Sequence, residues 1–199
     1  MKIICIEGNY SNKKKENQSE PVFFLKPESS LLRNTQPFFI PDHALKIILR
    51  VNIVLKICRL GKNIQEKFAR LYYNEIGIGV DMEAADILEK CRKNKLPWEP
   101  AKAYDFSSPL GKFISKDEFE DLTNISFSLV RNGEVFVRAN SSGMIYSFDK
   151  IISSVSKFMT LKTGDCIYTG SPGIDCGVEI NDSIECFIEN KKLLSFNIK

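Results

Sequence analysis

The stretch Leu161–Pro172, LKTGDCIYTGSP, sets a short apolar run between two groups of turn-forming residues. Its centre, Cys166–Thr169, is rich in β-branched and aromatic side chains, which favour strands. Gly164-Asp165 before it and Gly170-Ser171-Pro172 after it favour turns. The pattern predicts a strand of only a few residues. Because similar runs recur along the chain, the sequence predicts a fold dominated by short strands.

The other predicted strands share this composition and lie between polar segments. They are Lys2–Ile6, Val22–Leu25, Ile47–Cys58, Ile76–Val80, Ile125–Val130, Val135–Arg138, Val178–Ile180, Ser183–Glu189 and Leu193–Ile198. Asn132-Gly133 predicts a two-residue hairpin turn, since both residues tolerate a positive φ. A second hairpin is predicted to close across residues 190–192.

Helical periodicity is confined to two segments. Asp81–Lys93 and Asp149–Met159 carry apolar residues at a spacing of 3.6, and Asp149 is a candidate N-cap for the second helix. Strands and helices do not alternate regularly, which argues against a doubly wound parallel sheet. The sequence therefore predicts a mixed, β-rich α+β fold with few helices, as one domain over residues 1–199.

Composition and charge narrow the classes of function. The 199 residues are 43% hydrophobic and 27% charged, and the net charge of +3 is too small to indicate a nucleic-acid partner. Charged and polar residues interrupt the most apolar segment, so no membrane span is expected. The six cysteines show no zinc-type spacing and are expected to be reduced thiols. These features predict a cytoplasmic protein.

Four stretches, taken in order, carry a resemblance to a known family. They are Ile4-Cys5-Ile6 with Asn9-Tyr10 and Glu20–Pro27; Gly77–Met82 with Leu96-Pro97-Trp98 and Ala101-Lys102; Met144–Phe148; and Leu161–Asp165 with Tyr168–Pro172. Through them the chain resembles the fumarylacetoacetate hydrolase family, in its acylpyruvase and oxaloacetate decarboxylase branch. The resemblance implies a fold like the family's C-terminal domain, a homodimer, and chemistry on acylpyruvates or 2-oxo dicarboxylic acids with bound magnesium or manganese.

The family's metal ligands are three carboxylates, and the resemblance places Arg50, Asn52 and Asp81 at their positions. Only Asp81 is still a carboxylate. A hard divalent cation would lose most of its electrostatic attraction at such a site. We therefore expect no metal cofactor, and we expect the Arg50 guanidinium to pair with Asp81 instead.

The family's catalytic histidine and its glutamate partner correspond to Lys13 and Glu16. A lysine with an ordinary pKa of ~10.4 is almost always protonated at neutral pH, so Lys13 is a poor base. The resemblance also implies a catalytic role for Lys102 and substrate contacts for Tyr10 and Thr169. It leaves open whether Lys26 binds a ligand or anchors a loop.

Two further positions bear on catalysis. His43 is the only histidine, and its place in a polar turn favours a surface role, although a role as substitute base stays open. Ala85 stands where the family has an arginine that grips substrate carboxylates. The sequence therefore favours a catalytically impaired family member that binds a small anionic molecule resembling a 2-oxo acid. The alternative is an active hydrolase, decarboxylase or isomerase.

Overall fold

Strands dominate the computed structural model, which describes residues 1–10, 20–33 and 36–199. Within these residues an eight-stranded sheet has the order β2-β1-β9-β4-β5-β6-β3, and β10 pairs with β4 beside this path. Its strands are β1 (Ile3–Glu7), β2 (Val22–Lys26), β3 (Leu31–Arg33), β4 (Ile47–Ile57), β5 (Tyr73–Ala84), β6 (Ser108–Ser115), β9 (Cys166–Tyr168) and β10 (Cys176–Gly177). The pairs β1–β9 and β3–β6 are parallel and the other pairs are antiparallel, so the sheet is mixed.

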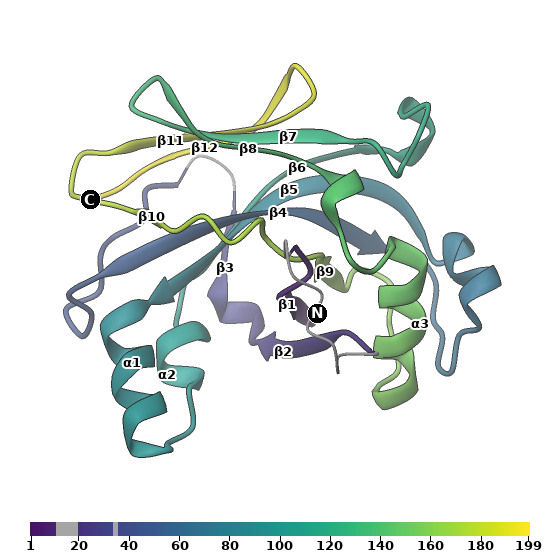
Figure 1. Cartoon of the computed structure of the whole chain (residues 1–199), viewed down its shortest axis with the longest axis horizontal. Helices are drawn as coiled ribbons and strands as arrows, with labels where there is room; N and C mark the ends of the chain where they lie inside the picture. Colours follow the sequence, from purple (N-terminus) through teal and green to yellow (C-terminus); the bar gives the residue numbers. More distant parts are fainter. Residues whose placement is uncertain (11–19, 34–35) are drawn as a thin grey trace.

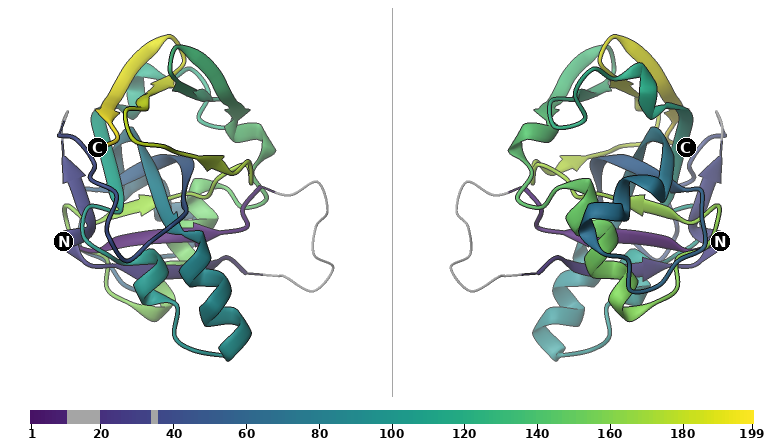
Figure 2. Two further views of the ribbon diagram at one scale, coloured as in Figure 1. Left: turned by 90° about the vertical axis from the view of Figure 1, so that its left-hand side faces the viewer. Right: turned by 90° about the vertical axis from the view of Figure 1, so that its right-hand side faces the viewer.

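A second, four-stranded antiparallel sheet has the order β12-β11-β7-β8 among the described residues. It consists of β7 (Ser126–Arg131), β8 (Glu134–Asn140), β11 (Ser183–Ile188) and β12 (Lys191–Asn197). Figures 1 and 2 show this sheet lying over one side of β4 and β5. The β-rich α+β fold predicted from the sequence is confirmed.

The helices lie on the side of β4 and β5 opposite to the second sheet (Figure 1). They are α1 (Ala85–Asn94), α2 (Glu99–Lys102) and α3 (Phe148–Phe158), with 3-10 turns η1 (Glu28–Ser30), η2 (Glu66–Leu71), η3 (Lys116–Glu118) and η4 (Ser141–Gly143). None of the helices in the described part of the chain is long and apolar enough to cross a membrane.

The sequence placed most elements within a few residues of where they lie. The Asn132-Gly133 hairpin is confirmed, with φ of 54° and 82°. The second hairpin turn lies one residue earlier than predicted, because Ile188 pairs with Lys191. Ser147, not Asp149, caps α3, since its side chain accepts the amide of Lys150.

Some predictions of secondary structure were wrong or incomplete. Val178–Ile180 lies outside any strand, and the neighbouring β10 pairs with β4 instead. Strand β6 escaped prediction because Pro109 and Gly111 read as turn residues. Residues 81–84 extend β5 rather than begin a helix, because this segment pairs with β4 along its whole length.

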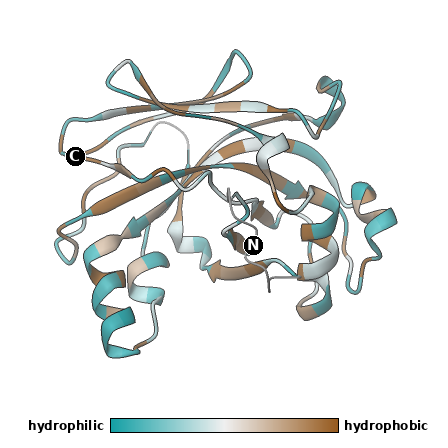
Figure 3. Cartoon of the chain, in the orientation of Figure 1, coloured by the Kyte–Doolittle hydropathy of each residue, from teal (hydrophilic) through white to brown (hydrophobic). Residues whose placement is uncertain are grey.

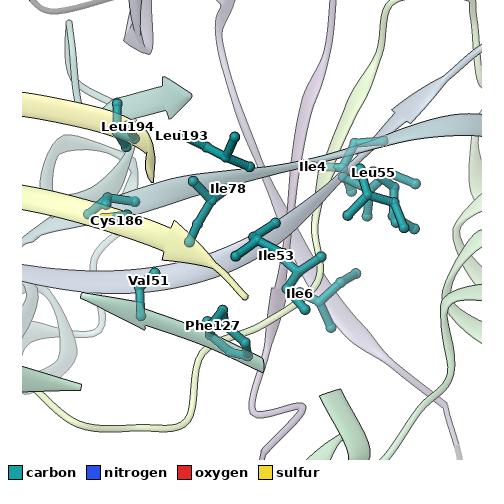
Figure 4. Packing of buried hydrophobic residues seen from close by; sticks show 14 of the residues in the cluster. Ile4, Ile6, Val51, Ile53, Leu55, Ile78, Phe127, Cys186, Leu193 and Leu194 are labelled. Atoms are coloured by element: carbon teal, nitrogen blue, oxygen red, sulfur yellow. The ribbon is translucent and has the colours of Figure 1, made fainter. Parts of the chain in front are cut away.

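The two faces of β4 have different surroundings. Val51, Ile53 and Leu55 point into the main core, where they pack with Phe127 and Cys186 of the second sheet (Figure 4). Figure 3 shows many hydrophobic residues along β4 and β5, whereas most residues of α1 are hydrophilic. The alternate residues of β4 lie on the opposite face. This second face carries Arg50 and Asn52.

A glycine keeps this second face open to a neighbouring ring. A Cβ built on Gly79 of β5 would lie 2.6 Å from the Tyr168 ring, which is fully buried. The Tyr168 hydroxyl donates to the backbone carbonyl of Pro109 at 3.3 Å. The absence of a side chain at Gly79 therefore leaves room for the Tyr168 ring, whose hydroxyl reaches β6.

All six cysteines are free thiols, and five of them are buried. Burial raises the pKa of Cys166 to about 12 and that of Cys176 to about 11. Thiols with such pKa values are protonated at neutral pH and poorly nucleophilic. Cys166 and Cys176 therefore act as packing residues.

Candidate functional site

A cavity of about 230 Å³ opens on the second face of the large sheet. Its lining includes Glu7 at the end of β1, Arg50 of β4 and Asp81 of β5. Arg50 and Asp81 stand directly opposite each other in the antiparallel register, so their side chains share a face. The strand register therefore brings together two of the three positions that the sequence associated with the metal site.

Arg50 forms two ion pairs, and neither is with Asp81. Its Nη1 lies 2.6 Å from Glu83 Oε2, and its Nη2 lies 3.0 Å from Asp175 Oδ1. The expectation of an Arg50–Asp81 pair is therefore wrong. An arginine side chain is long enough to pass the residue opposite and reach its diagonal neighbour, and Glu83 is that neighbour of Asp81.

The buried lysine Lys26 is the partner of Asp81. The Lys26 ammonium has no solvent exposure and lies 2.6 Å from Asp81 Oδ1. It also donates to the backbone carbonyls of Met82 at 3.2 Å and Ser107 at 2.8 Å. Of the two roles left open for Lys26, these contacts place it as an anchor that joins β2 to β5.

Lys102 is the centre of a larger charge cluster. Its ammonium, only 1% exposed, lies 2.7 Å from Glu83, 3.3 Å from Glu7 and 3.6 Å from Asp81. Burial lowers the pKa of Lys102, but the carboxylates of Asp81, Glu7 and Glu83 raise it more, so the net pKa is raised. Lys102 is therefore protonated and paired with these carboxylates, so it does not act as a base.

Lys102 also lines a second cavity of about 370 Å³. Its ammonium lies 4.7 Å from the ring centre of Phe24 and 5.8 Å from that of Trp98. Both distances are within the range of cation–π attraction. The aromatic rings and the carboxylates together fix the position of this ammonium.

Asn52 ties β4 to the turn that follows β9. Its amide nitrogen donates to the Arg50 carbonyl at 2.9 Å, and its amide oxygen accepts the Gly170 N–H at 2.9 Å. Thr169 in the same turn is fully buried, and its hydroxyl donates to the Ile53 carbonyl at 3.0 Å. The Thr169 side chain thus does not line the 230 Å³ cavity, whereas Ser171 does.

Two hydroxyl groups line this cavity without a hydrogen-bond partner among the described residues. They are Tyr10 Oη and Ser171 Oγ, and both atoms are buried. Burial raises the pKa of Tyr10, so its hydroxyl stays protonated at neutral pH. Both groups are available to donate hydrogen bonds to a bound molecule.

The remaining sequence candidates are Lys13, Glu16, His43 and Ala85. Lys13 and Glu16 fall outside the described residues. His43 is exposed, and its ring meets the Tyr104 ring edge-on with centres 5.4 Å apart, away from the lining of the cavity. Ala85 begins α1 and carries no group that could grip a carboxylate.

Three carboxylates of the site escaped the sequence analysis: Glu7, Glu83 and Asp175. Glu83 follows Asp81 by two residues on one strand, and this spacing alone would have placed both carboxylates on one face. No comparable signal points to Asp175. It reaches Arg50 across 125 positions of the chain, which only the folded structure brings together.

The donor set does not suit a divalent metal. Asp81 faces Lys26 and Lys102, and Glu83 faces Lys102 and Arg50. Among the described residues no three histidine, cysteine or acidic side chains form a group that could hold a metal ion. A hard cation would have to displace ammonium or guanidinium groups from the carboxylates it needs.

We expect millimolar magnesium to leave the melting temperature unchanged. A metal present at about a hundred times its Kd would stabilise the folded protein by about 2.7 kcal/mol. Thermal unfolding with magnesium or with a chelator tests this. The double variant Arg50→Glu/Asn52→Glu is the positive control, because it restores two carboxylates. A rise in melting temperature of the unaltered protein with magnesium would contradict the expectation.

A family model and curated relatives match this chain over most of its length. The family model described as "Fumarylacetoacetate (FAA) hydrolase C-terminal" matches residues 2–198. The chain belongs to the fumarylacetoacetate hydrolase family. Among its relatives, the mitochondrial oxaloacetate tautomerase FAHD1 of Mus musculus is 34% identical over 201 residues, covering 99% of this chain and 91% of the relative. The oxaloacetate tautomerase YcgM of Escherichia coli is 36% identical over 176 residues, covering 86% and 80%.

Solved structures agree on the fold. A fumarylacetoacetate hydrolase family protein from Yersinia pestis superposes with a TM-score of 0.92 at 30% identity, covering all of this chain and 93% of the other. Fumarylpyruvate hydrolase from Pseudomonas aeruginosa, solved with Mn²⁺ and pyruvate, has a TM-score of 0.91 at 24% identity and covers 100% and 89%. The family fold is thus retained over the whole chain.

Proposed function

We propose that this family member catalyses the keto–enol tautomerisation of a small 2-oxo dicarboxylic acid of the oxaloacetate class, without a divalent metal. Support comes from the relatives named oxaloacetate tautomerase, which this chain matches over most of their length. The active-enzyme alternative drawn from the sequence is thus favoured over an impaired protein. The proposal differs from the general family chemistry in needing no metal.

One observation carries the proposal: the 230 Å³ cavity holds a carboxylate, a protonated phenol and a guanidinium together. Glu7 is the accessible carboxylate, with a side chain 40% exposed. Tautomerisation moves a proton between the carbon next to a carbonyl and the carbonyl oxygen. It breaks no carbon–carbon bond and activates no water. It therefore needs only a base and a hydrogen-bond donor, both of which this cavity supplies.

The residues divide these roles. Glu7 takes the proton from the carbon next to the carbonyl and returns it to the carbonyl oxygen to complete the enol, while the Tyr10 hydroxyl donates a hydrogen bond to that oxygen as negative charge develops there. Lys102, 3.3 Å behind Glu7, positions that carboxylate. Hydrolysis and decarboxylation of this class of substrates must in addition break a carbon–carbon bond. We therefore expect them to be much slower at this site.

The experiment is a spectrophotometric assay of enol conversion with oxaloacetate in a chelating buffer. The expected result is conversion faster than in buffer alone, at a rate that neither chelator nor added magnesium changes. Release of CO₂ from the same samples should stay at the background level. Conversion that appears only with magnesium or manganese would contradict a metal-free site.

A second candidate is the impaired, ligand-binding protein, and a specific observation favours it. Each cation of the site already contacts a carboxylate: Lys26 contacts Asp81, Arg50 contacts Glu83, and Lys102 contacts both. Such a saturated cluster leaves little free positive charge to stabilise a reacting anion. No conversion above background in the assay, together with measurable binding of a dicarboxylate, would select this candidate.

A further inference from the structure

The Arg50 guanidinium is held by two carboxylates that differ in accessibility. The Glu83 side chain is 4% exposed and the Asp175 side chain is 52% exposed. Glu83 also pairs with Lys102 at 2.7 Å, so this buried carboxylate is held by two cations. Asp175 lies at the surface, just before the two-residue strand β10. The buried Glu83 is thus a fixed partner of Arg50, whereas the exposed Asp175 can be displaced.

Asp175 occupies two donors of Arg50 with a single oxygen. Its Oδ1 accepts from Nε at 3.2 Å and from Nη2 at 3.0 Å, on the side of the guanidinium where two donors point the same way. Arginine pairs most strongly with a carboxylate when each of two such parallel donors has its own oxygen. A ligand carboxylate arriving in the cavity would use the same two donors.

The surroundings of this contact form a prepared polar site. Arg50, Asp175, Ser171 and Tyr10 line one cavity, and the two hydroxyls in it have no partner among the described residues. Burial lowers the pKa of Arg50, but Glu83 and Asp175 raise it more, so the guanidinium is permanently charged. A fixed cation with two free hydroxyl groups nearby suits a small dicarboxylate.

We propose that Arg50 is the carboxylate anchor of this site and that Asp175 is an internal competitor, which a ligand carboxylate displaces. The proposal rests on the site of the proposed function and assigns the residue that recognises its substrate. An ion pair with one partner more than half exposed contributes little, so releasing Asp175 into solvent costs little. The ligand pair would be less exposed and gain the two hydroxyls as further partners.

This assignment also accounts for the absence of an arginine at position 85. Ala85 carries no charge, and it stands at the start of α1. Arg50 presents a guanidinium from β4 instead, and Glu83 on β5 holds it toward the cavity. The cation that would have opposed a metal thereby becomes the group that selects acidic ligands.

The test is isothermal titration calorimetry with malonate, a dicarboxylate that undergoes no tautomerisation to an oxaloacetate-type enol. Asp175→Asn should bind malonate about threefold to fivefold more tightly than the unaltered protein, the gain expected from removing a competing partner that is itself weakly held. Arg50→Gln should weaken binding at least about tenfold. Arg50→Lys should lie between, because lysine keeps the charge and loses the paired donors.

Two controls separate displacement from general charge. Glu7→Gln removes a carboxylate that lines the same cavity but makes no contact with Arg50, and Asp117→Asn removes one at an exposed position outside it. Neither should tighten malonate binding as Asp175→Asn does. Equal tightening by Glu7→Gln, or no change with Asp175→Asn, would overturn the competitor role. Unchanged binding by a folded Arg50→Gln or Arg50→Lys variant would overturn the anchor.

The readout also separates this inference from the proposed function. Malonate binding requires no turnover. If oxaloacetate is not converted but Asp175→Asn still tightens malonate binding, the anchor and its competitor stand while the catalytic proposal fails. If oxaloacetate is converted and Asp175→Asn leaves malonate binding unchanged, the competitor role fails while the catalytic proposal stands.

Discussion

Replacing Lys26 with methionine is expected to destabilise the protein by about 3–5 kcal/mol, the usual range for breaking a buried ion pair by removing one partner. Methionine fills a similar volume, so the effect arises from charge rather than from a cavity. The change removes the ammonium 2.6 Å from Asp81, which is 7% exposed, and leaves the Ser107 carbonyl without that donor. Urea unfolding gives the free energy directly.

Two variants test the cause of this loss. Lys26→Met/Asp81→Asn should be clearly more stable than Lys26→Met alone, because it no longer buries an underpaired carboxylate. Lys191→Met is the matched surface control, since Lys191 pairs with Glu118 at an exposed position, and it should cost less than ~1 kcal/mol. A Lys26→Met loss no larger than the Lys191→Met loss would show that Lys26 is not an anchor.

Replacing Glu7 with glutamine is expected to lower kcat for oxaloacetate tautomerisation by about 10²-fold to 10⁴-fold, the usual contribution of a positioned general base. Glutamine has nearly the same shape and cannot accept the proton. Because Glu7 is 40% exposed, the melting temperature should hardly change. KM should stay within a few-fold, since the anchor proposed for the substrate is Arg50. Steady-state kinetics in chelating buffer checks both values.

The matched control is Glu120→Gln, which alters an exposed glutamate outside the cavity. It should leave both constants unchanged. Unaltered kcat in Glu7→Gln would remove Glu7 as the base. A fall in kcat accompanied by loss of folded protein would point to a structural role through the contact with Lys102.

The fold could be predicted largely from local patterns. Strand β4 is rich in β-branched apolar residues on either side of Arg50 and Asn52, and the Asn132-Gly133 turn specifies its hairpin through two positive φ values. Strand β6 was missed because it contains Pro109 and Gly111, and it is held in place by pairing with β5 and β3. Local propensity gave way to tertiary pairing at that point.

The position of the site could be predicted from the sequence, but the ion pairs within it could not. The resemblance placed Arg50, Asn52 and Asp81 on one cavity, and the register of β4 with β5 brings them together. The partners depend on side-chain length and burial, which no spacing encodes. Lys26 reaches Asp81 from β2, and Asp175 reaches Arg50 from a distant loop. Contacts of this kind are fixed only when the chain is folded.

The two hydrogen bonds of Asn52 bear on how the site could change over evolutionary time. An amide can donate to the Arg50 carbonyl and accept from the Gly170 N–H at once, whereas an ionised glutamate can only accept. A single reversion of Asn52 to glutamate would therefore lose the donated bond and place a new negative charge beside the turn before any metal ligand was gained. The other lost position would still be an arginine held by two carboxylates. A carboxylate introduced at either position alone would thus lose existing contacts before a set of metal ligands was complete.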